Sequence, residues 1–301
     1  MKKVLVVYYT QTGQLREIAQ SVVRPLLQSG NVEVTFHEIL PVTPFPFPWP
    51  RDAFFGVFPE TFLQTPVPLH PIPPKVLGQR YDLVLFFYQT WYLSPSIPAN
   101  SFLQSAEGRC ILKETRVVTI NGSRNMWIIA QEKVKTMLKD AGARLVGNIA
   151  LVDQAGNLIS VITIVGWMFS GIKKKHWGVL PLPGVSQKDV EGASGFGAMI
   201  LAALMAGNYD LLQPQIVEGG GVRIKPFLVL TDRTGNKLFA KWARLIVGHP
   251  NSRPMLLKLF NIYLFLAIWL ISPIVYILHV ITLPLKIKQI SRDRNYFQGV
   301  A

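Results

Sequence analysis

Residues 4–15 read VLVVYYTQTGQL, and this stretch decides the fold. Val4 to Val7 are apolar on both faces, which is typical of a central strand in a parallel sheet covered by helices on both sides. A Thr/Gly loop follows at residues 10–14, and the pattern then predicts a helix over about 14–27. The unpaired N–H groups and positive dipole end of such a helix favour an anion in the loop.

The residues of this loop suit a phosphate monoester. Thr10 and Thr12 supply hydroxyl donors, and Gly13 allows a ligand to approach the backbone closely. The Lys-Ser/Thr pair of a nucleoside triphosphate loop is missing. An ordinary strand–loop–helix turn without a ligand is the alternative. The residues expected at the phosphate are Thr10, Gln11, Thr12, Gly13, Gln14 and Leu15.

The pattern Thr-x-Thr-Gly after an N-terminal strand resembles the phosphate loop of flavodoxins and flavodoxin-like oxidoreductases, which hold FMN. The resemblance implies an α/β doubly wound fold, in which ligands lie outside the carboxyl ends of parallel strands. Further strands are expected at residues 32–38, 82–88, 116–120 and 145–152. We therefore expect a five-stranded parallel sheet of order 2-1-3-4-5 within residues 1–153, followed by a largely helical, hydrophobic C-terminal extension.

An aromatic loop follows the predicted strand 82–88. Flavodoxin-like quinone reductases and FMN reductases carry a similar strand, aromatic loop, Pro and Phe-Leu pair, so the resemblance implies that Trp91 and Tyr92 flank the isoalloxazine ring. Aromatic side chains commonly stack in this way, and core packing is the alternative. The usual Gly-Thr/Ser-Pro of those families is absent here. The residues expected at the ring are Thr90, Trp91, Tyr92 and Leu93.

A polar loop follows the predicted strand 116–120. Its backbone N–H groups, together with Ser123 or Arg124, can reach the N1/O2 edge of a flavin and stabilise the charge of the reduced form. A helix cap made by Asn121 or Ser123 is the alternative. The residues expected at this edge are Asn121, Gly122, Ser123, Arg124 and Asn125.

The composition of the whole chain favours a membrane surface over nucleic acid as the acidic partner. The formal charge is +14, but only 16% of the residues are charged and 50% are hydrophobic. Proteins that bind nucleic acid are usually charged throughout, whereas a basic and apolar chain suits an anionic leaflet. We therefore expect no nucleic acid partner.

The strongest membrane signal is the run 259–285, which holds no formally charged side chain. Such a run is long enough to span a bilayer. Basic residues flank both ends, so the positive-inside rule gives no orientation. Pro273 near the middle can kink a span or turn a re-entrant hairpin, and a buried core helix is the alternative. We expect residues 255–301 to form a membrane-associated segment with a basic tail.

Two other parts of the chain depart from a plain flavodoxin. Residues 154–254 are apolar and basic. Within them, the uncharged run 154–172 suits a membrane interface. The Gly- and Ala-rich run 192–207 predicts a tightly packed core helix. Residues 41–74 hold 11 of the 22 prolines and many aromatic rings. This insertion predicts an ordered lid or channel wall beside the flavin, and a docked loop without ligand contact is the alternative.

Several common chemistries are excluded. One cysteine, Cys110, leaves no intramolecular disulfide and no multi-Cys metal site. The five histidines show no metal-ligand spacing, and no Gly-x-Ser-x-Gly elbow is present. The N-terminus runs directly into a strand without a secretory signal. We therefore expect no metal, and a catalytic domain on the cytoplasmic face of the membrane.

Several segments are similar to the bacterial family of dialkylresorcinol condensing enzymes. They read MKKVLVVYYTQTGQL (1–15), PFPFPW (44–49), YQTWYLSPSIP (88–98), NGSRNMW (121–127) and WMFSG (167–171), with the terminal Tyr296-Phe297. In that pathway of flexirubin-type aryl polyene pigments, a ketosynthase joins two acyl precursors into a dialkyl cyclohexanedione, and the flavodoxin-like partner aromatises the ring to a resorcinol. The resemblance therefore implies an FMN-dependent oxidoreductase with a lipophilic substrate and a ketosynthase as partner. The chain lacks both the Cys-His-His set and the length of a ketosynthase.

Aromatisation of a cyclohexane-1,3-dione transfers a hydride to the flavin while a base takes a proton. Tyr92, His176 and a water held by Arg124 are the candidates for the base, and the sequence does not choose among them. A membrane-associated NAD(P)H-dependent quinone or FMN reductase is one alternative, and a non-enzymatic flavodoxin-like scaffold is another. A homodimer stays open on the sequence alone.

Overall fold

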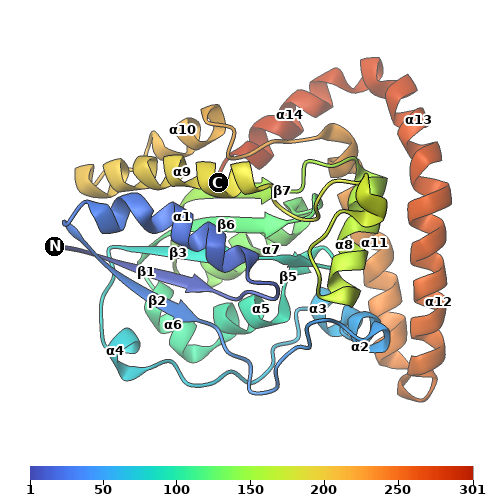
Figure 1. The fold of residues 1–301 in the computed structure, drawn as a ribbon, viewed down its shortest axis with the longest axis horizontal. Helices are drawn as coiled ribbons and strands as arrows, with labels where there is room; N and C mark the ends of the chain where they lie inside the picture. The colour runs from blue at the N-terminus through green and yellow to red at the C-terminus, as the bar shows by residue number, and fades with distance from the viewer. Residues whose placement is uncertain (301) are drawn as a thin grey trace.

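The computed structural model describes residues 1–300, with a five-stranded parallel sheet at the centre of the N-terminal half (Figure 1). The strands are β1 (Lys2–Tyr8), β2 (Val32–Glu38), β3 (Leu83–Tyr88), β6 (Arg116–Ser123) and β7 (Arg144–Val152). They lie in the order β2-β1-β3-β6-β7, and each neighbouring pair is parallel. This order is flavodoxin-like, so the predicted fold class is confirmed.

Helices cover both faces of the sheet because β1 and β3 are apolar on both faces. Val4 and Val6 point into one core with α1 (Gln14–Gln28), α9 (Gln187–Ala206) and α10 (Leu212–Glu218). Leu5 and Val7 point into a second core with α5 (Ile97–Gln104), α6 (Ala106–Leu112) and α7 (Ile128–Asp140). The alternation of side chains along a strand produces these two layers.

The Gly- and Ala-rich run forms part of α9, which packs closely on α1. A Cβ added at Gly197 would lie 1.9 Å from the carbonyl oxygen of Val22, so only glycine permits this approach. The prediction of a tightly packed core helix is therefore confirmed.

The proline-rich insertion is ordered and lies against the helices of the extension. It contains α2 (Arg51–Gly56) and α3 (Phe58–Phe62) and leads into α4 (Pro74–Leu77). Phe54 meets Phe169 edge-on with their ring centroids 5.4 Å apart, and Phe58 meets Phe239 at 5.3 Å. Aromatic packing therefore gives this segment its own small core.

The aromatic loop after β3 forms a short hairpin that the sequence did not predict. β4 (Thr90–Trp91) pairs antiparallel with β5 (Ser94–Pro95), and Tyr92 and Leu93 make the turn between them. Both turn residues are left-handed, with φ of 46° and 60°. This turn directs the Tyr92 side chain towards the insertion, where it meets Phe58.

The extension after β7 consists of helices. They are α8 (Asn157–Ser170), η1 (His176–Gly178), α9, α10, α11 (Pro226–Gly248), η2 (Pro250–Ser252), α12 (Arg253–Leu266), η3 (Ala267–Ile271), α13 (Ser272–Thr282), η4 (Leu283–Lys286) and α14 (Ile287–Gln298). Figure 1 shows α12 and α13 as one long rod beside α11, with α14 turning back towards the sheet. The chain continues as helix past Pro273 after the π-helical turn η3, so the hairpin alternative at this proline is wrong.

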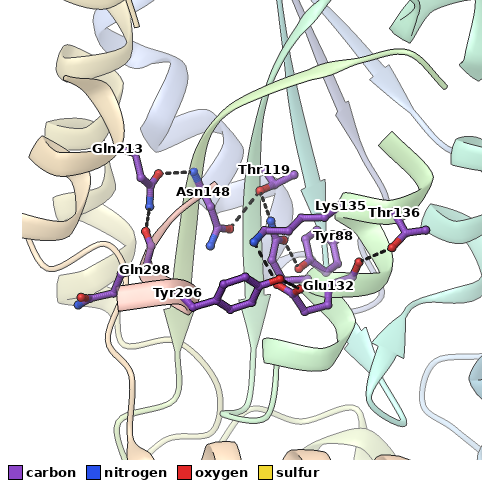
Figure 2. Close-up of polar contacts among 10 residues, drawn as sticks. Tyr88, Thr119, Glu132, Lys135, Thr136, Asn148, Gln213, Tyr296 and Gln298 are labelled. Carbon is purple, nitrogen blue, oxygen red and sulfur yellow. Dashed lines mark hydrogen bonds and ion pairs between the residues drawn. The ribbon is translucent and has the colours of Figure 1, made fainter. Parts of the chain in front are cut away.

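The last helix, α14, ends on the α/β half of the molecule. Phe297 is buried in the core of the sheet. The Tyr296 hydroxyl donates to Glu132 at 2.7 Å, and the Gln213 side chain donates to the carbonyl oxygen of Gln298 at 2.6 Å. Figure 2 shows Tyr296 and Gln298 reaching these partners beside the sheet. The C-terminal segment therefore returns to the body from which it departs.

Two helical stretches are long and apolar enough to cross a membrane by length and composition, Gln187–Ala206 and Pro250–Gln298. The first is the helix α9 that covers the sheet.

Candidate functional site

A cavity of about 830 Å³ lies at the carboxyl ends of the parallel strands. Its polar side is lined by residues from the loops after β1, β3 and β6, which are the three loops that the sequence predicts. Its apolar side is lined by α8, α11, α12, η3 and α13, through residues such as Val161, Trp167, Phe227, Leu238, Leu264 and Ile268. One space therefore joins the strand ends to the helical extension.

The loop between β1 and α1 leaves free N–H groups at the N-terminus of α1. Gly13 is left-handed with φ of 87°, and its N–H donates to the Thr10 hydroxyl oxygen at 3.1 Å. The N–H of Gln14 points to the Thr12 hydroxyl oxygen at 3.5 Å. Among residues 1–300, the N–H groups of Thr12 and Leu15 have no acceptor. Free N–H groups at a helix N-terminus can bind a phosphate.

The two glutamines of this loop hold neighbouring segments with their side chains. The Gln14 amide donates to the carbonyl oxygen of Val185 at 2.8 Å and accepts from the N–H of Val185 at 3.0 Å. The Gln11 amide donates to the carbonyl oxygen of Pro46 at 2.7 Å. The side chains of Gln11 and Gln14 are therefore engaged in positioning the loop, although both residues line the cavity.

Trp91 lies in the cavity wall and is held there by other aromatic rings. Its ring meets Phe45, Trp49 and Tyr9 nearly perpendicularly, with centroids 5.2, 5.4 and 6.0 Å apart. Edge-to-face packing of this kind fixes the orientation of the indole. Trp49 also lines the cavity, as do Phe54 and Phe55. The insertion therefore forms part of the cavity wall.

Tyr92 is not placed to act as a base. Its hydroxyl donates to the carbonyl oxygen of Phe54 at 2.7 Å, and burial raises the pKa of the Tyr92 hydroxyl well above its ordinary value. The phenolate, and not the neutral phenol, is the form of tyrosine that acts as a base, and the raised pKa disfavours the phenolate. The hydrogen bond and the raised pKa therefore do not favour Tyr92 as the base, although Tyr92 lines the cavity together with Leu93.

His176 does not reach the cavity. It lies in η1, against α8, where a Cβ added at Gly166 would lie 1.8 Å from Nε2 of His176. The cavity-lining residues do not include it. The structure therefore places His176 beside α8 and apart from the residues that line the cavity.

Arg124 is the more buried of two arginines that line the cavity, the other being the exposed Arg51. It follows β6, and one guanidinium nitrogen donates at 3.1 Å to both the side-chain and the backbone oxygen of Asn157. No carboxylate in the described part of the chain forms an ion pair with it. Burial lowers the pKa of Arg124 to about 10, with the charge of Asp153 acting in the opposite direction. The group remains charged at neutral pH and can bind an anion.

The loops after β3 and β6 are joined to each other. The N–H of Thr90 donates to the Ser123 hydroxyl oxygen at 3.0 Å, and the Asn121 amide donates to the Thr90 hydroxyl oxygen at 3.2 Å. The Asn125 amide donates to the side-chain oxygen of Asn157 at 3.0 Å. The sequence analysis missed Asn157, because its role depends on α8 lying beside these loops.

Buried polar atoms remain unsatisfied around this part of the cavity. Nε2 of Gln89, Oδ1 of Asn121 and Oδ1 of Asn125 have no hydrogen-bond partner within residues 1–300. Leaving such a group unpaired costs about 1–3 kcal/mol. Together they offer one donor and two acceptors. A flavin ring carries both acceptors and a donor along one edge, so these residues fit that cofactor.

Thr10, Gly13 and Asn121 do not themselves line the cavity, but they shape the loops that do. The other predicted cofactor residues, including Gly122, lie together on its wall. Gly122 lies close to α1, where an added Cβ would come within 2.8 Å of the Leu15 side chain.

No protein-family model matches this chain, and no curated protein matches its sequence. Solved structures with a similar fold include a flavoprotein from Lactobacillus acidophilus in complex with FMN, at 15% sequence identity and a TM-score of 0.38. That similarity covers 50% of this chain and 93% of the flavoprotein. A flavodoxin from the domain Archaea is 11% identical with a TM-score of 0.39, covering 68% of this chain and 99% of the flavodoxin. The assignment of the flavodoxin-like fold rests on the strand order itself.

Proposed function

We propose that this protein is an FMN-dependent oxidoreductase that acts on a lipid-soluble cyclic diketone. The observation that carries the proposal is the single cavity that joins three polar strand-end loops to an apolar wall of helices. The loop after β1 would hold the phosphate of FMN, and the loops after β3 and β6 would hold its ring. The apolar wall is then left for the substrate.

The resemblance to dialkylresorcinol condensing enzymes suggests the substrate. We propose a dialkyl cyclohexane-1,3-dione, which becomes a dialkylresorcinol when one ring carbon loses a hydride and its neighbour loses a proton. Bound oxidised FMN supplies the acceptor for the hydride. A ketosynthase of the same pathway is the class of enzyme that would supply the diketone.

The residues of this chain would prepare the substrate for that transfer. The Arg124 guanidinium can polarise a diketone oxygen and stabilise the negative charge of its enolate, which makes the neighbouring C–H more acidic. We propose that water beside Arg124 takes the proton, because the Tyr92 hydroxyl donates to the carbonyl oxygen of Phe54 and His176 does not line the cavity. Each alkyl CH₂ buried on the apolar wall would contribute about 0.8 kcal/mol to binding.

A membrane location accompanies this function. A substrate with two alkyl chains remains in lipid, and the uncharged run 259–285 together with the charge of +14 suits an anionic leaflet. We place the protein on the cytoplasmic face of the membrane.

The test begins with the absorption spectrum of the full-length protein purified in detergent. We expect a flavin band that is bleached anaerobically by a dialkyl cyclohexane-1,3-dione, with one resorcinol formed per flavin by mass spectrometry. Bleaching by NADPH but not by the diketone would instead identify the quinone or FMN reductase. A colourless protein that also fails to take up added FMN would identify a scaffold without cofactor.

A further inference from the structure

The exposed side of the C-terminal rod, α12, η3 and α13, indicates how this protein meets lipid. We infer that the rod lies in the plane of one membrane leaflet without crossing the bilayer, and that the cavity opens directly into that leaflet. A lipid-soluble substrate then reaches the site without passing through water. The identity of that substrate rests on the proposed function, but the geometry does not.

The rod presents a continuous apolar surface to the outside. Between Lys258 and Lys286 no side chain is formally charged, and large apolar residues are exposed along the whole length. They include Ile262, Phe265, Leu270, Ile274, Ile277 and Ile281. An exposed apolar patch of this extent is rare on a soluble monomer and marks an interaction surface.

Both ends of the rod are tied to the same body. At its start, Arg253 forms a bidentate ion pair with Glu60 of the insertion, with both distances 2.8 Å. Beyond its end, Asp293 of α14 forms a bidentate ion pair with Arg233 of α11, at 2.8 and 3.0 Å, and Phe297 enters the core of the sheet. A bilayer core about 30 Å thick would have to separate these ends if the rod crossed it.

The neighbouring helix α11 also prevents a crossing. It runs antiparallel beside the rod, because Phe227 near its start meets Tyr276 at 5.0 Å and Trp242 near its end meets Tyr263 at 5.4 Å. Five formally charged residues lie on α11: Asp232, Arg233, Lys237, Lys241 and Arg244. A spanning rod would draw these side chains into the hydrocarbon core, which is costly. In the plane of a leaflet, α11 lies between the rod and the body.

The cavity opens on this apolar surface. Phe265, Trp269 and Ile271 line the cavity, and they are also 60%, 37% and 50% exposed. Residues that contact both the cavity and the outside form its rim. A leaflet that covers the rod would therefore also cover the opening.

Basic residues at both ends of the rod favour an anionic leaflet over a second copy of this basic chain. Lys258 is exposed at one end, and Lys288 is exposed just past the other. Each basic side chain close to an anionic surface favours binding, whereas two chains of charge +14 repel one another. This arrangement is that of an in-plane amphipathic anchor.

The first experiment locates the two ends of the rod in the full-length protein. Single cysteines are placed at Met255, Ile277 and Ser291 in a Cys110→Ser background, since all three positions are exposed. Inverted membrane vesicles and spheroplasts of an expression host are treated with a membrane-impermeant maleimide. We expect labelling of Met255→Cys and Ser291→Cys in inverted vesicles only, and of Ile277→Cys only after detergent is added.

Three outcomes would overturn the in-plane geometry. Labelling of the two end positions from opposite sides shows a spanning helix. Labelling of Ile277→Cys without detergent, with the protein in the soluble fraction, shows that no lipid covers the rod. Protection of Ile277→Cys in a lipid-free dimer, detected by sedimentation, shows that a second copy covers it.

The second experiment tests the opening of the cavity. The experiment compares two variants, Phe265→Cys and Ile262→Cys. Phe265 lies at the rim of the cavity, whereas Ile262 is exposed on the rod but does not line the cavity. In vesicles, we expect both to react with N-dodecylmaleimide and neither with the impermeant reagent. Reaction of Phe265→Cys alone with the impermeant reagent would show a cavity that opens to water. These labelling measurements need neither flavin nor diketone, so their outcome does not depend on whether the proposed function is correct.

Discussion

Phe58 and Phe260 stack face to face, with their ring centroids 3.7 Å apart and their planes inclined by 10°. Phe58 belongs to the proline-rich insertion and Phe260 to α12, and both are completely buried. Phe239 of α11 meets both rings edge-on, at 5.3 and 5.5 Å. Three segments far apart in the sequence are therefore joined in a core that is separate from the two cores of the sheet.

The first prediction concerns this aromatic core. Phe260→Ala removes a fully buried ring and is expected to lower the free energy of unfolding by about 3–5 kcal/mol, as measured by urea denaturation in detergent. Because the rings touch, Phe58→Ala and Phe260→Ala together should cost less than the sum of the two. Exposed Phe265→Ala serves as the control and should change stability by no more than about 0.5 kcal/mol. If the losses in the free energy of unfolding of the two single variants simply add in the double variant, the rings of Phe58 and Phe260 do not interact directly.

The second prediction concerns the phosphate loop. Gly13→Asp should abolish flavin retention, because it places a carboxylate beside the expected phosphate dianion. Two controls separate charge from backbone strain. Gly13→Asn controls for the side chain without the charge, since Asn is neutral and tolerated at positive φ. Gly30→Asp controls for the charge and the strain, because Gly30 is also left-handed and open but lies far from the loop. Both controls should keep their flavin absorbance, and a stoichiometric flavin in Gly13→Asp would contradict the assignment of the loop.

The third prediction concerns the aromatic wall. Trp91→Ala should weaken FMN binding or change its fluorescence, because the indole lines the cavity and is held by three other rings. Titration of apoprotein with FMN measures both effects. Trp177→Ala is the matched control, since Trp177 is largely exposed and lies outside the cavity. If Trp91→Ala and Trp177→Ala give the same FMN affinity and fluorescence, Trp91 packs in the core and does not contact the flavin.

The fourth prediction concerns Arg124. Arg124→Met should reduce kcat/KM for the diketone by about 10- to 100-fold, since a hydrogen bond to a charged group contributes about 1.5–3 kcal/mol. Activity of the wild-type protein should fall as the pH rises through about 10, where the guanidinium loses its proton. Exposed Arg51→Met, at another cavity residue, is the control and should keep nearly full activity. If the activity of Arg124→Met falls with pH in the same way as that of the wild-type protein, a group other than Arg124 causes the fall.

The fifth prediction concerns Asp232, a buried carboxylate on α11. Its side chain accepts from the N–H of Ile129 in the first turn of α7 at 3.2 Å, which links the extension to the helix that follows the loop after β6. Burial raises the pKa of Asp232 to about 7, against the opposing effects of the N–H groups of Ile129 and Ile128 and of the charge of Lys133. Between the ordinary carboxyl pKa and about 7, the folded state binds more protons than the unfolded state. The contribution of Asp232 to stability should therefore be most favourable at low pH and fall as the pH rises through this window.

Two variants check the contribution of Asp232 by urea denaturation at pH 4.5 and pH 7.5. Asp232→Asn resembles the protonated carboxyl group and should remove most of the fall in stability. Asp210→Asn, at an exposed position, should leave the fall unchanged. If both variants behave alike, the pH dependence arises elsewhere.

The sheet order and the three site loops could be predicted because their signals are local. Val4 to Val7 are apolar on both faces and a Thr/Gly loop follows at residues 10–14, while the apolar strands at 83–88 and 116–120 lead into aromatic and polar loops. Parallel strands then bring their carboxyl ends to one edge, so the loops meet without any further information.

The roles of individual side chains could not be predicted, because their partners are remote in sequence. Gln14 bonds to Val185, 171 residues away, and Arg124 bonds to Asn157, 33 residues away. The same holds for the Tyr92 hydroxyl, whose acceptor lies in the insertion. His176 has no local feature that distinguishes a site residue from one that packs outside the cavity.

The sequence by itself determined that residues 259–285 are too apolar to be stable in water as an isolated helix, since composition alone sets the cost of hydration. Only the tertiary structure decided where that helix runs. The ion pairs Arg253–Glu60 and Arg233–Asp293 and the burial of Phe297 bring both of its flanks back to one body. Such contacts depend on the positions of whole elements in space, which hydrophobic patterning along the chain does not encode.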